Sequence, residues 1–295
     1  MTNTDTPSRH LRVAPLGFLP EDGLVLDLGH GTTAVTVTRD GWKVVQAGAE
    51  LPEFRRTPAT KPLPVPVPGG KLPELRKLLN VGDEEWAKVA GWLIASLLPD
   101  ITRPVLLLTG APCSGKSVVA LLLQHLVDPG SPFRRLPADE DEWIAATDAA
   151  RVIGFDDVAR VPDWQSDALC VAVSGGAMTK RGLGEPFPFV PRPDRAFILA
   201  GSLAPDELRA DLADRTVAVE LRPLIERRPE SELWKAYTEA RPRILGALLD
   251  LLVAVLDKLP TVRAMADRGD IPQVRMVDHG LVLVALEGAT GGRSA

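Results

Sequence analysis

The amino-acid sequence predicts an α/β protein in which a parallel sheet is flanked by helices. Between residues 83 and 223, short apolar runs that are typical of buried strands alternate with segments of helical periodicity. The stretch GAPCSGKS, residues 110–117, lies between one apolar run and one apolar helical segment. Because strand–loop–helix units of this kind cross over between parallel neighbours, both observations favour a parallel sheet.

The composition of the 295-residue chain is that of an ordinary globular protein, with 45% hydrophobic and 25% charged residues. A net charge of −5 excludes a uniformly basic surface for nucleic acid but allows a local basic groove. Two cysteines make no disulfide framework, and four scattered histidines have no metal-ligand spacing. The N-terminus lacks the apolar run of a signal peptide, and no apolar stretch is long enough to span a membrane. We therefore expect a cytoplasmic protein.

The N-terminal quarter of the chain predicts a small β-rich region followed by an extended segment. Residues 23–47 alternate apolar and polar side chains around two turns, which is typical of short strands, so residues 1–56 form the first predicted region. Residues 57–73 contain six prolines and two glycines, which disfavour regular structure and predict a linker.

The main α/β core, which contains the GAPCSGKS stretch, is predicted at residues 74–225 and a helical C-terminal region at 226–295. Helices are predicted at 82–98 and 116–127, and buried strands at 104–110, 150–158, 194–202 and 215–223. From Ser231 onward the pattern is helical, and Pro242 predicts a break or a new first turn. The sequence leaves open whether residues 261–295 pack against the core or form a tail.

The stretch at 110–117 matches the spacing G-x-x-x-x-G-K-[ST] of a phosphate-binding loop in full. Its glycines let backbone amides point at a phosphate, and the following helix directs its positive dipole end at the same anion. We expect Lys116 to reach the β- and γ-phosphates of ATP, and the Ser117 hydroxyl to ligate Mg²⁺. The expected nucleotide-binding residues are Gly110, Ala111, Pro112, Cys113, Ser114, Gly115, Lys116 and Ser117.

Two acidic residues end the apolar run VIGFDDV, about forty residues after this loop. A P-loop enzyme requires one carboxylate at the Mg²⁺ and a polar group for the attacking water. Asp156 suits the metal role and Asp157 the water-activating role. Adjacent strand residues point to opposite faces, so both need not bind the metal. An acidic turn after a core strand would be the alternative for either residue taken alone.

Basic residues suggest two further roles. Arg215 precedes the last apolar run, where it is a candidate arginine finger or a surface partner of Asp211 or Asp214. Lys180 and Arg181 stand between pairs of glycines, as in a hairpin with a basic tip. Such a tip suits contact with a nucleic-acid backbone, and a solvated turn is the alternative.

The order of GAPCSGKS, VIGFDDV, SGGAMTKRGLGEPF and DLADRTVAVEL resembles that of AAA+-type P-loop ATPases related to superfamily 3 helicases. The resemblance is to the helicase-like ATP-binding proteins of bacterial phages and integrative elements, and it covers roughly Leu72 to Pro260. It implies ATP hydrolysis with Mg²⁺, and a homo-oligomeric ring, such as a hexamer, that moves on DNA. Single-stranded DNA would contact Lys180 and Arg181 in the channel of such a ring.

The sequence departs from this family at one position. In these ATPases the strand that here reads AFILAGS is expected to end in a polar sensor residue, and Ala200 stands in that place. Ser202, two residues on, is the nearest polar substitute. The departure leaves three functions open. The first is a DNA-directed ATPase of mobile-element replication, the second a nucleotide-binding regulator or scaffold with weak hydrolysis, and the third a P-loop kinase.

Overall fold

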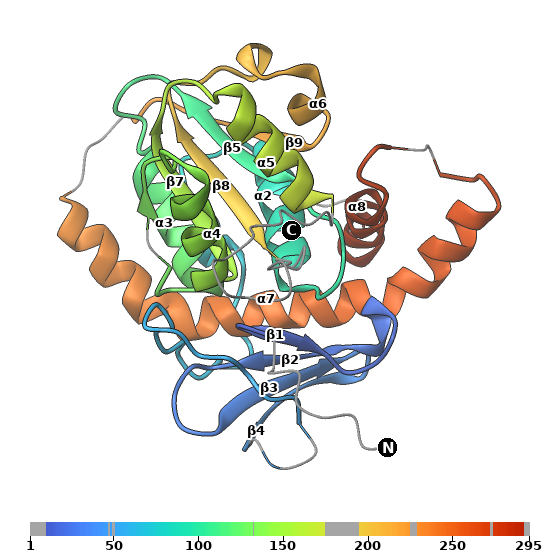
Figure 1. Cartoon of the computed structure of the whole chain (residues 1–295). Helices are drawn as coiled ribbons and strands as arrows, with labels where there is room; N and C mark the ends of the chain where they lie inside the picture. Colours follow the sequence, from blue (N-terminus) through green and yellow to red (C-terminus); the bar gives the residue numbers. More distant parts are fainter. Residues whose placement is uncertain are drawn as a thin grey trace, which may run out of the picture.

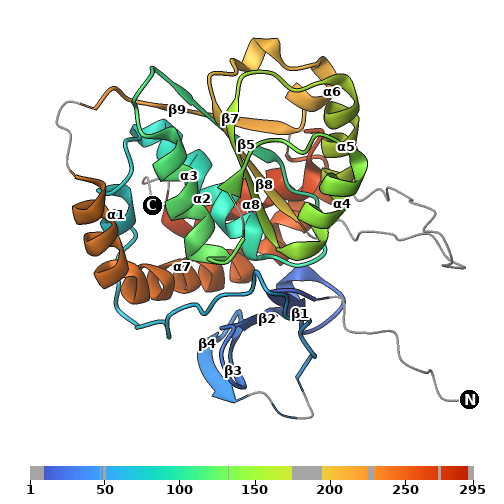
Figure 2. The same ribbon diagram turned by 60° about the vertical axis from the view of Figure 1, so that its left-hand side comes forward.

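The protein is built in two layers on either side of one long helix (Figure 1). The computed structural model describes residues 10–46, 48, 51–131, 133–174, 195–224, 229–271 and 274–291. A five-stranded sheet with its helices forms the larger layer, and a four-stranded sheet forms the smaller one. Helix α7, Glu230–Asp267, runs between them, as the turned view also shows (Figure 2).

The smaller layer is an antiparallel sheet whose strands follow one another in chain order. The strands are β1 (Val13–Pro15), β2 (Leu24–Asp27), β3 (Thr33–Thr38) and β4 (Gly41–Gln46), with the 3-10 turn η1 (Pro20–Asp22) between β1 and β2. Alternation places Val35 and Val37 of β3 on the buried face, where they join the same apolar core as the helices above. Strands β1 and β4 are the two edges of this sheet.

The larger sheet is parallel throughout, in the order β6-β7-β8-β5-β9. Its strands are β5 (Val105–Gly110), β6 (Phe133–Arg134), β7 (Val152–Val158), β8 (Ala196–Gly201) and β9 (Thr216–Leu221). The predicted α/β class with a helix-flanked parallel sheet is therefore confirmed. Because all five strands run the same way, every loop that follows a strand opens at one edge, the carboxyl edge.

Helices cover both faces of this sheet, and strand alternation assigns the side chains to them. On one face Ile198 and Ala200 of β8 belong to the core that includes α2 and α3, and on the other Phe197 and Leu199 meet α4, α5 and α6. The helix bounds are α1 (Pro73–Arg76), α2 (Asp83–Leu97), α3 (Lys116–Val127), α4 (Glu140–Ala149), α5 (Asp163–Val173) and α6 (Ala210–Ala213). A short 3-10 turn, η2 (Pro205–Glu207), follows β8.

Helix α7 corrects one sequence prediction, because it continues through Pro242 and Pro260 without a break. Apolar residues of α7 from Ile244 to Val262 are buried by the two layers, and this burial outweighs the missing N–H of each proline. The sequence left open whether residues 261–295 pack against the core, and the described part of this region does so. Helix α8, Val277–Thr290, packs against α2 and α7.

The proline-rich segment before α1 contains no helix or strand, and it is fastened to the protein at several points. Leu63 is buried, and its amide donates to the carbonyl of Leu28 in the small layer. The Val67 amide donates to the carbonyl of Pro242, in the middle of α7. Pro242 therefore accepts a hydrogen bond from this segment although its own nitrogen cannot donate one.

A buried ion pair joins the two layers. Arg12, at the start of the small sheet, donates from Nη2 to Oδ1 of Asp128 at 2.8 Å, and both side chains are almost fully buried. Asp128 follows the end of α3, and its other oxygen accepts from the Arg151 amide just before β7. The same carboxylate thus connects the small sheet, α3 and β7.

Candidate nucleotide-binding site

The GAPCSGKS stretch forms a tight loop between the end of β5 and the start of α3. Gly110 has φ +132°, and a Cβ there would lie 2.7 Å from the carbonyl oxygen of Leu221 on β9. Gly115, the residue before α3, is left-handed with φ +87°. Cys113 is also left-handed, with φ +61°, which is uncommon for a residue with a side chain. The loop therefore depends on backbone conformations that glycine tolerates and most residues do not.

Several polar groups of this loop either lack a hydrogen-bond partner or bond only to the loop itself. Helix α3 has no side-chain N-cap, so the amides of its first turn have no partner within the helix. The Ser114 hydroxyl is buried without a hydrogen-bond partner. The Lys116 ammonium donates to the carbonyl oxygens of Gly110 and Ala111, 3.0 Å from each, and so closes over the loop. These donors suit an oxyanion ligand.

Ser117 and Asp156 meet across the space between α3 and β7. The Ser117 hydroxyl donates to Oδ1 of Asp156 at 2.7 Å, although the two residues are 39 positions apart. Alternation along β7 explains the contact, because Val152, Gly154 and Asp156 share the face that α3 covers. A hydroxyl and a carboxylate placed together beside a phosphate loop are the oxygen ligands that Mg²⁺ prefers.

Asp157 lies beside this pair but points elsewhere. The pairing of β7 with β8 shifts register between Phe155 and Val158, so Asp156 and Asp157 occupy a β-bulge. Asp157 has φ +56°, and its exposed carboxylate accepts from Nη2 of Arg135 at 2.9 Å. Arg135 follows the short edge strand β6, and its side chain is 83% exposed. The second acidic residue is therefore held in an ion pair at the carboxyl edge of the sheet.

Strand β8, on which a polar sensor residue was expected, lies between the two halves of this site. Strand β8 pairs with β7 on one side and β5 on the other, and Ala200 faces Leu108 of β5 in register. Ala200 is fully buried on the face that α3 covers. Ser202 is exposed just beyond the end of β8. At the end of β8, the Ser202 hydroxyl is therefore the side-chain polar group next to Ala200. Ala200 itself offers no polar side chain to a ligand.

Arg215 lies at the opposite edge of the sheet from the phosphate-binding loop. It precedes β9, whose far end Leu221 pairs with Gly110, so the six residues of β9 separate it from the loop by roughly 20 Å. Its guanidinium donates to the Ser174 hydroxyl and the Asp211 backbone carbonyl, not to a carboxylate. Within one subunit Arg215 cannot reach its own loop.

Lys180 and Arg181, the predicted DNA contacts, lie outside the described residues. Their role therefore stays a prediction.

The structure also brings to the loop a polar side chain that the sequence did not indicate. The side-chain amide of Asn80 donates to the Ser114 carbonyl at 3.4 Å and to the carbonyl of Arg222, and so ties the loop to the end of β9. Only the position of Asn80 just before an acidic helix start gave a signal for it.

Arg135 was also missed. It belongs to the stretch PFRRLP, whose strand is two residues long and has no readable alternation. A pair of arginines after a single aromatic residue gives no indication of where they lie. Their place beside Asp157 results from the pairing of β6 with β7.

The residues present fit a nucleotide with one divalent cation better than a metal held by protein alone. In the described part of the chain, no group of three or more His, Cys, Asp or Glu side chains could hold a metal ion. Ser117 and Asp156 supply two oxygen ligands, and Mg²⁺ commonly takes its others from phosphates and water. A helix search over the same residues finds none that is long and apolar enough to cross a bilayer.

Comparisons with solved structures found proteins of low sequence identity. The apo C-terminal region of NrS-1 is 11% identical with a TM-score of 0.48, over 80% of this chain and 73% of that one. The active helicase Cch of SCCmec type IV is 14% identical with a TM-score of 0.47, over 91% of this chain and 55% of that one. The JCV helicase is 16% identical with a TM-score of 0.31, over 74% and 66%.

A search among curated proteins found no match. One protein family matches most of the sequence, from residue 73 to residue 294, and so includes the loop, the acidic pair and α8. On this match, the chain belongs to the family of actinomycete integrative conjugative element replication proteins.

Proposed function

We propose that the protein is an ATP-hydrolysing, DNA-directed motor that acts as a helicase-like ATPase in replication of an integrative conjugative element. Membership of the replication protein family supports the biological setting. The single observation that carries the chemistry is the 2.7 Å contact between Ser117 and Asp156 beside a complete phosphate-binding loop.

Each residue has a role in this proposal. The loop amides and Lys116 would bind the phosphates, and Ser117 and Asp156 would hold Mg²⁺, which would neutralise charge on the phosphates. Asp157 accepts a proton from water once its carboxylate leaves Arg135. Ser202 orients that water in place of the amide absent at Ala200.

The same proposal assigns DNA and a second subunit to the remaining basic residues. Lys180 and Arg181 contact single-stranded DNA, and a ring of subunits would concentrate their charge although each chain has a net charge of −5. Arg215 serves the nucleotide of a neighbouring subunit, because it lies too far from its own loop. Head-to-tail contacts, which place one edge of a subunit against another part of the next, allow such sharing.

A second function is favoured by one observation. Ala200 is fully buried at the position where a polar sensor is expected, so no side chain there can reach a phosphate or water. A nucleotide-binding regulator or scaffold with weak hydrolysis would keep the loop, Ser117 and Asp156 but would not require that sensor. The two functions differ in turnover, not in nucleotide binding.

The chain contains its own reporter of nucleotide binding. Cys113 lies exposed within the loop, and the other cysteine, Cys170, has its thiol pKa raised by burial. In a Cys170→Ser protein, we expect ATP with Mg²⁺ to slow thiol modification of Cys113 at least about tenfold, because the bound phosphates cover the loop. Lys116→Ala should abolish this protection. If ATP with Mg²⁺ does not protect Cys113 in the Cys170→Ser protein, in which Lys116 is intact, nucleotide binding at the loop is excluded.

Steady-state ATP hydrolysis with and without single-stranded DNA then separates the two functions. Turnover that rises with DNA and disappears in Lys116→Ala supports the motor. Protection of Cys113 without turnover supports the regulator. Lys77→Ala, which removes an amine outside the loop, is the matched control and should change neither result.

A further inference from the structure

The phosphate-binding loop gives a bound nucleotide a direction. Strand β5, which leads into the loop, has β8 and then β7 on one side and β9 on the other. Ser117 and Asp156, the expected Mg²⁺ ligands, meet on the β7 side. Because Mg²⁺ in such sites bridges the β- and γ-phosphates, the terminal phosphates would lie on that side. The nucleoside would then leave the loop toward the end of β9.

A short segment before α2, residues 80–82, is bonded to the chain that follows β9. The Arg222 amide donates to the Asn80 carbonyl at 2.9 Å, and the Asn80 side-chain amide donates back to the Arg222 carbonyl. The same side-chain amide reaches the Ser114 carbonyl in the loop at 3.4 Å. The segment, the end of β9 and the loop are therefore bonded to one another, which fixes nearby side chains beside the phosphate position.

Two exposed side chains at this place, which we call the stacking pair, are Arg222 and Leu224. The Arg222 guanidinium lies against Gly82, where an added Cβ would be 2.8 Å from Nη2 and 3.4 Å from Cζ. Leu224 is 42% exposed, and its Cδ1 lies 3.9 Å from the place of a Cβ on Gly115 in the loop. A guanidinium plane and an aliphatic side chain are both surfaces that suit the face of an aromatic ring.

The polar groups around the stacking pair are already engaged. The amide and the carbonyl of Arg222 both bond to Asn80, whose side-chain amide also serves Ser114. In the first turn of α2, the Glu85 carboxylate accepts from the Glu220 amide at 3.1 Å. These groups are the ones that would otherwise form hydrogen bonds with the edge of a base. The surroundings thus favour contact with the face of a base over recognition of its edge.

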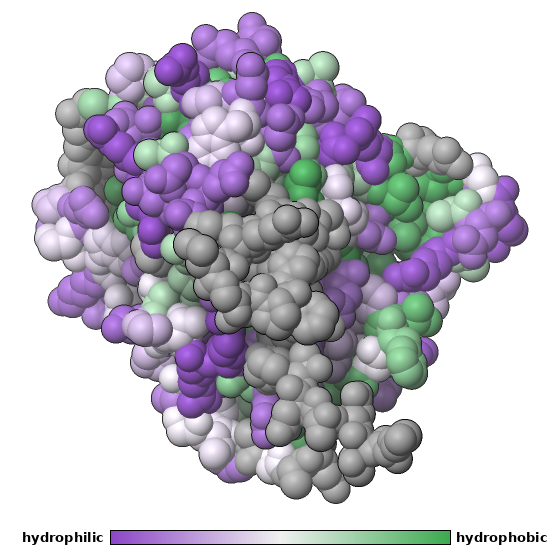
Figure 3. Space-filling view, in the orientation of Figure 1, coloured by the Kyte–Doolittle hydropathy of each residue, from purple (hydrophilic) through white to green (hydrophobic). Residues whose placement is uncertain are grey.

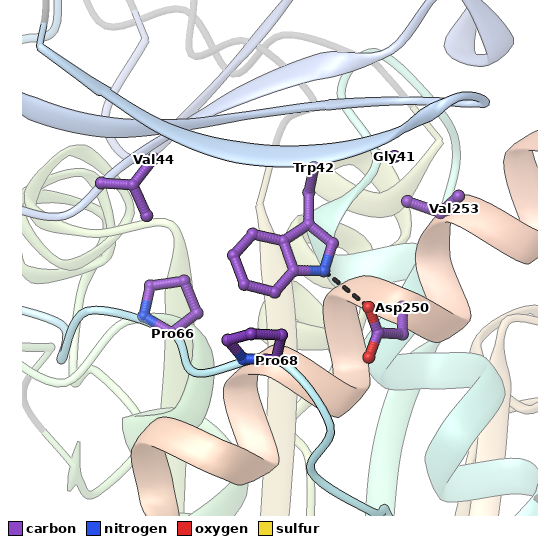
Figure 4. A pocket seen from close by; sticks show the side chains of 7 residues that line it. All are labelled: Gly41, Trp42, Val44, Pro66, Pro68, Asp250 and Val253. Carbon is purple, nitrogen blue, oxygen red and sulfur yellow. Dashed lines mark hydrogen bonds between the residues drawn. The ribbon is translucent and has the colours of Figure 1, made fainter.

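A hollow of about 490 Å³ lies in another part of the molecule, between β4, the proline-rich segment and α7 (Figure 4). Its lining includes the Asp250 carboxylate, which accepts from the indole nitrogen of Trp42 at 2.7 Å. A carboxylate there would repel phosphates, and no residue of the phosphate-binding loop lines the hollow. The hollow is therefore not part of the nucleotide site.

We propose that Arg222 and Leu224 hold the base of the nucleotide by stacking and do not read its edge, so that the substrate class is nucleoside triphosphates in general. Every base has a flat face, and stacking alone therefore tolerates all of them. Purines should bind more tightly than pyrimidines, because their ring system is larger. The inference deepens the proposed function and rests on it for the binding of phosphates by the loop.

The first test compares bases by protection of Cys113 in the Cys170→Ser protein. The probes are ATP, GTP and UTP, each with Mg²⁺. We expect half-protection by ATP and GTP at similar concentrations, and by UTP within about tenfold of them, because stacking differs only modestly between bases. Protection by ATP with GTP and UTP more than about a hundredfold weaker would mean that hydrogen bonds read the base, and would overturn the proposal.

The second test separates the base from the phosphates, with inorganic tripolyphosphate and Mg²⁺ as the probe that lacks a base. Arg222→Ala should raise the ATP concentration for half-protection about tenfold and leave that of tripolyphosphate unchanged, because only a base can stack. Arg222→Lys keeps the charge but not the plane, so it should behave as Arg222→Ala does. Leu224→Ser should act in the same direction, and the exposed Arg39→Ala is the control.

These variants change side chains only, so the backbone bonds between Arg222 and Asn80 are retained. Equal weakening of ATP and tripolyphosphate in Arg222→Ala, or full ATP affinity in Arg222→Lys, would mean that the arginine acts through its charge and would overturn the proposal. Unchanged ATP protection in Arg222→Ala would overturn it as well. All three outcomes leave nucleotide binding at the loop intact. Protection of the Cys170→Ser protein by neither ATP nor tripolyphosphate would instead refute the proposed nucleotide binding itself.

Discussion

At the scale of single residues, the acidic pair divides its contacts between two directions. Asp156 accepts from Ser117 inside the site, and Asp157 faces outward to Arg135. Asp157 also lies in the β-bulge and has a left-handed backbone, so it departs from the regular path of β7. The two adjacent acids therefore have different partners, one in the loop and one on the edge strand.

We expect Asp157→Asn to lower ATP turnover by about a hundredfold while leaving nucleotide binding intact, since proton acceptance contributes roughly that much.

Arg135→Ala should raise basal turnover several-fold without changing the KM for ATP, because it frees the carboxylate of Asp157 from its ion pair. Steady-state kinetics would check both, and Arg39→Ala, at an exposed turn, is the control. Unchanged turnover in Asp157→Asn would remove this residue from the chemistry.

His279 is a second residue whose environment has a measurable consequence. It is buried between α8 and α2, its Nε2 has no hydrogen-bond partner, and burial lowers its pKa to about 4. The imidazole is therefore neutral in the folded protein at pH values where it takes up a proton in the unfolded chain.

The folded pKa lies below the unfolded value of 6.5, so the stability linked to His279 is present above pH 6.5 and is lost as pH falls toward 4. The total loss is about 3 kcal/mol. Guanidinium unfolding between pH 7.5 and 4.5 should show a shallower decline for His279→Leu than for wild type. The exposed His30→Leu protein should follow the wild-type curve, and parallel curves for all three would contradict the assignment.

At this scale, residues that act within one short stretch were the predictable ones. The glycines, Lys116 and Ser117 are adjacent in sequence, and the acidic pair follows an apolar run of readable length. Arg135 and Asn80 could not be predicted, because their positions depend on pairing with elements far away in the chain.

At the scale of elements, α7 shows how packing overrides local preference. Pro242 predicted a break, yet the helix continues from Glu230 to Asp267. In α3 and β5, by contrast, the local sequence preference and the burial in the core favour the same structure, so these elements were predicted correctly. Helix α3 was predicted at 116–127, and its observed bounds are the same.

We expect Pro242→Ala to stabilise the protein by about 1 to 2 kcal/mol. Alanine stabilises a helix interior by about 3 kcal/mol relative to proline. Alanine also makes the unfolded chain more flexible, which lowers the gain in unfolding free energy by about 1 kcal/mol. The hydrogen bond from Val67 uses the backbone carbonyl and is retained. Thermal unfolding would measure the gain, and Pro58→Ala, at an exposed turn, should not show it. A destabilised Pro242 variant would mean that the helix requires the proline ring for packing.

At the scale of the whole molecule, the sheet layers share one continuous apolar core across α7. The class of the larger layer followed from alternating strands and helices, but the docking of the smaller layer did not. Arg12 and Asp128 are 116 residues apart, and nothing in either sequence context indicates that they meet. Long-range burial of this kind has no periodic signature.

The outer surface of the molecule is uneven in polarity. On the face seen in Figure 3, hydrophilic residues cover much of the larger layer, and hydrophobic surface gathers around α8. Val274, Val277 and Leu283 are exposed in this part of the chain. Exposed apolar surface on this face is therefore concentrated near the C-terminal helix.

The position of α7 between the two sheets also limits where the chain can be truncated. The family match begins at residue 73, as though a self-sufficient unit started there. Yet the preceding residues cover one side of α7 with β3, β4 and the proline-rich segment. A recombinant fragment that began at residue 73 would expose apolar side chains along much of α7, and it would be prone to aggregation. Expression of the region that matches the family should therefore retain the residues before position 73.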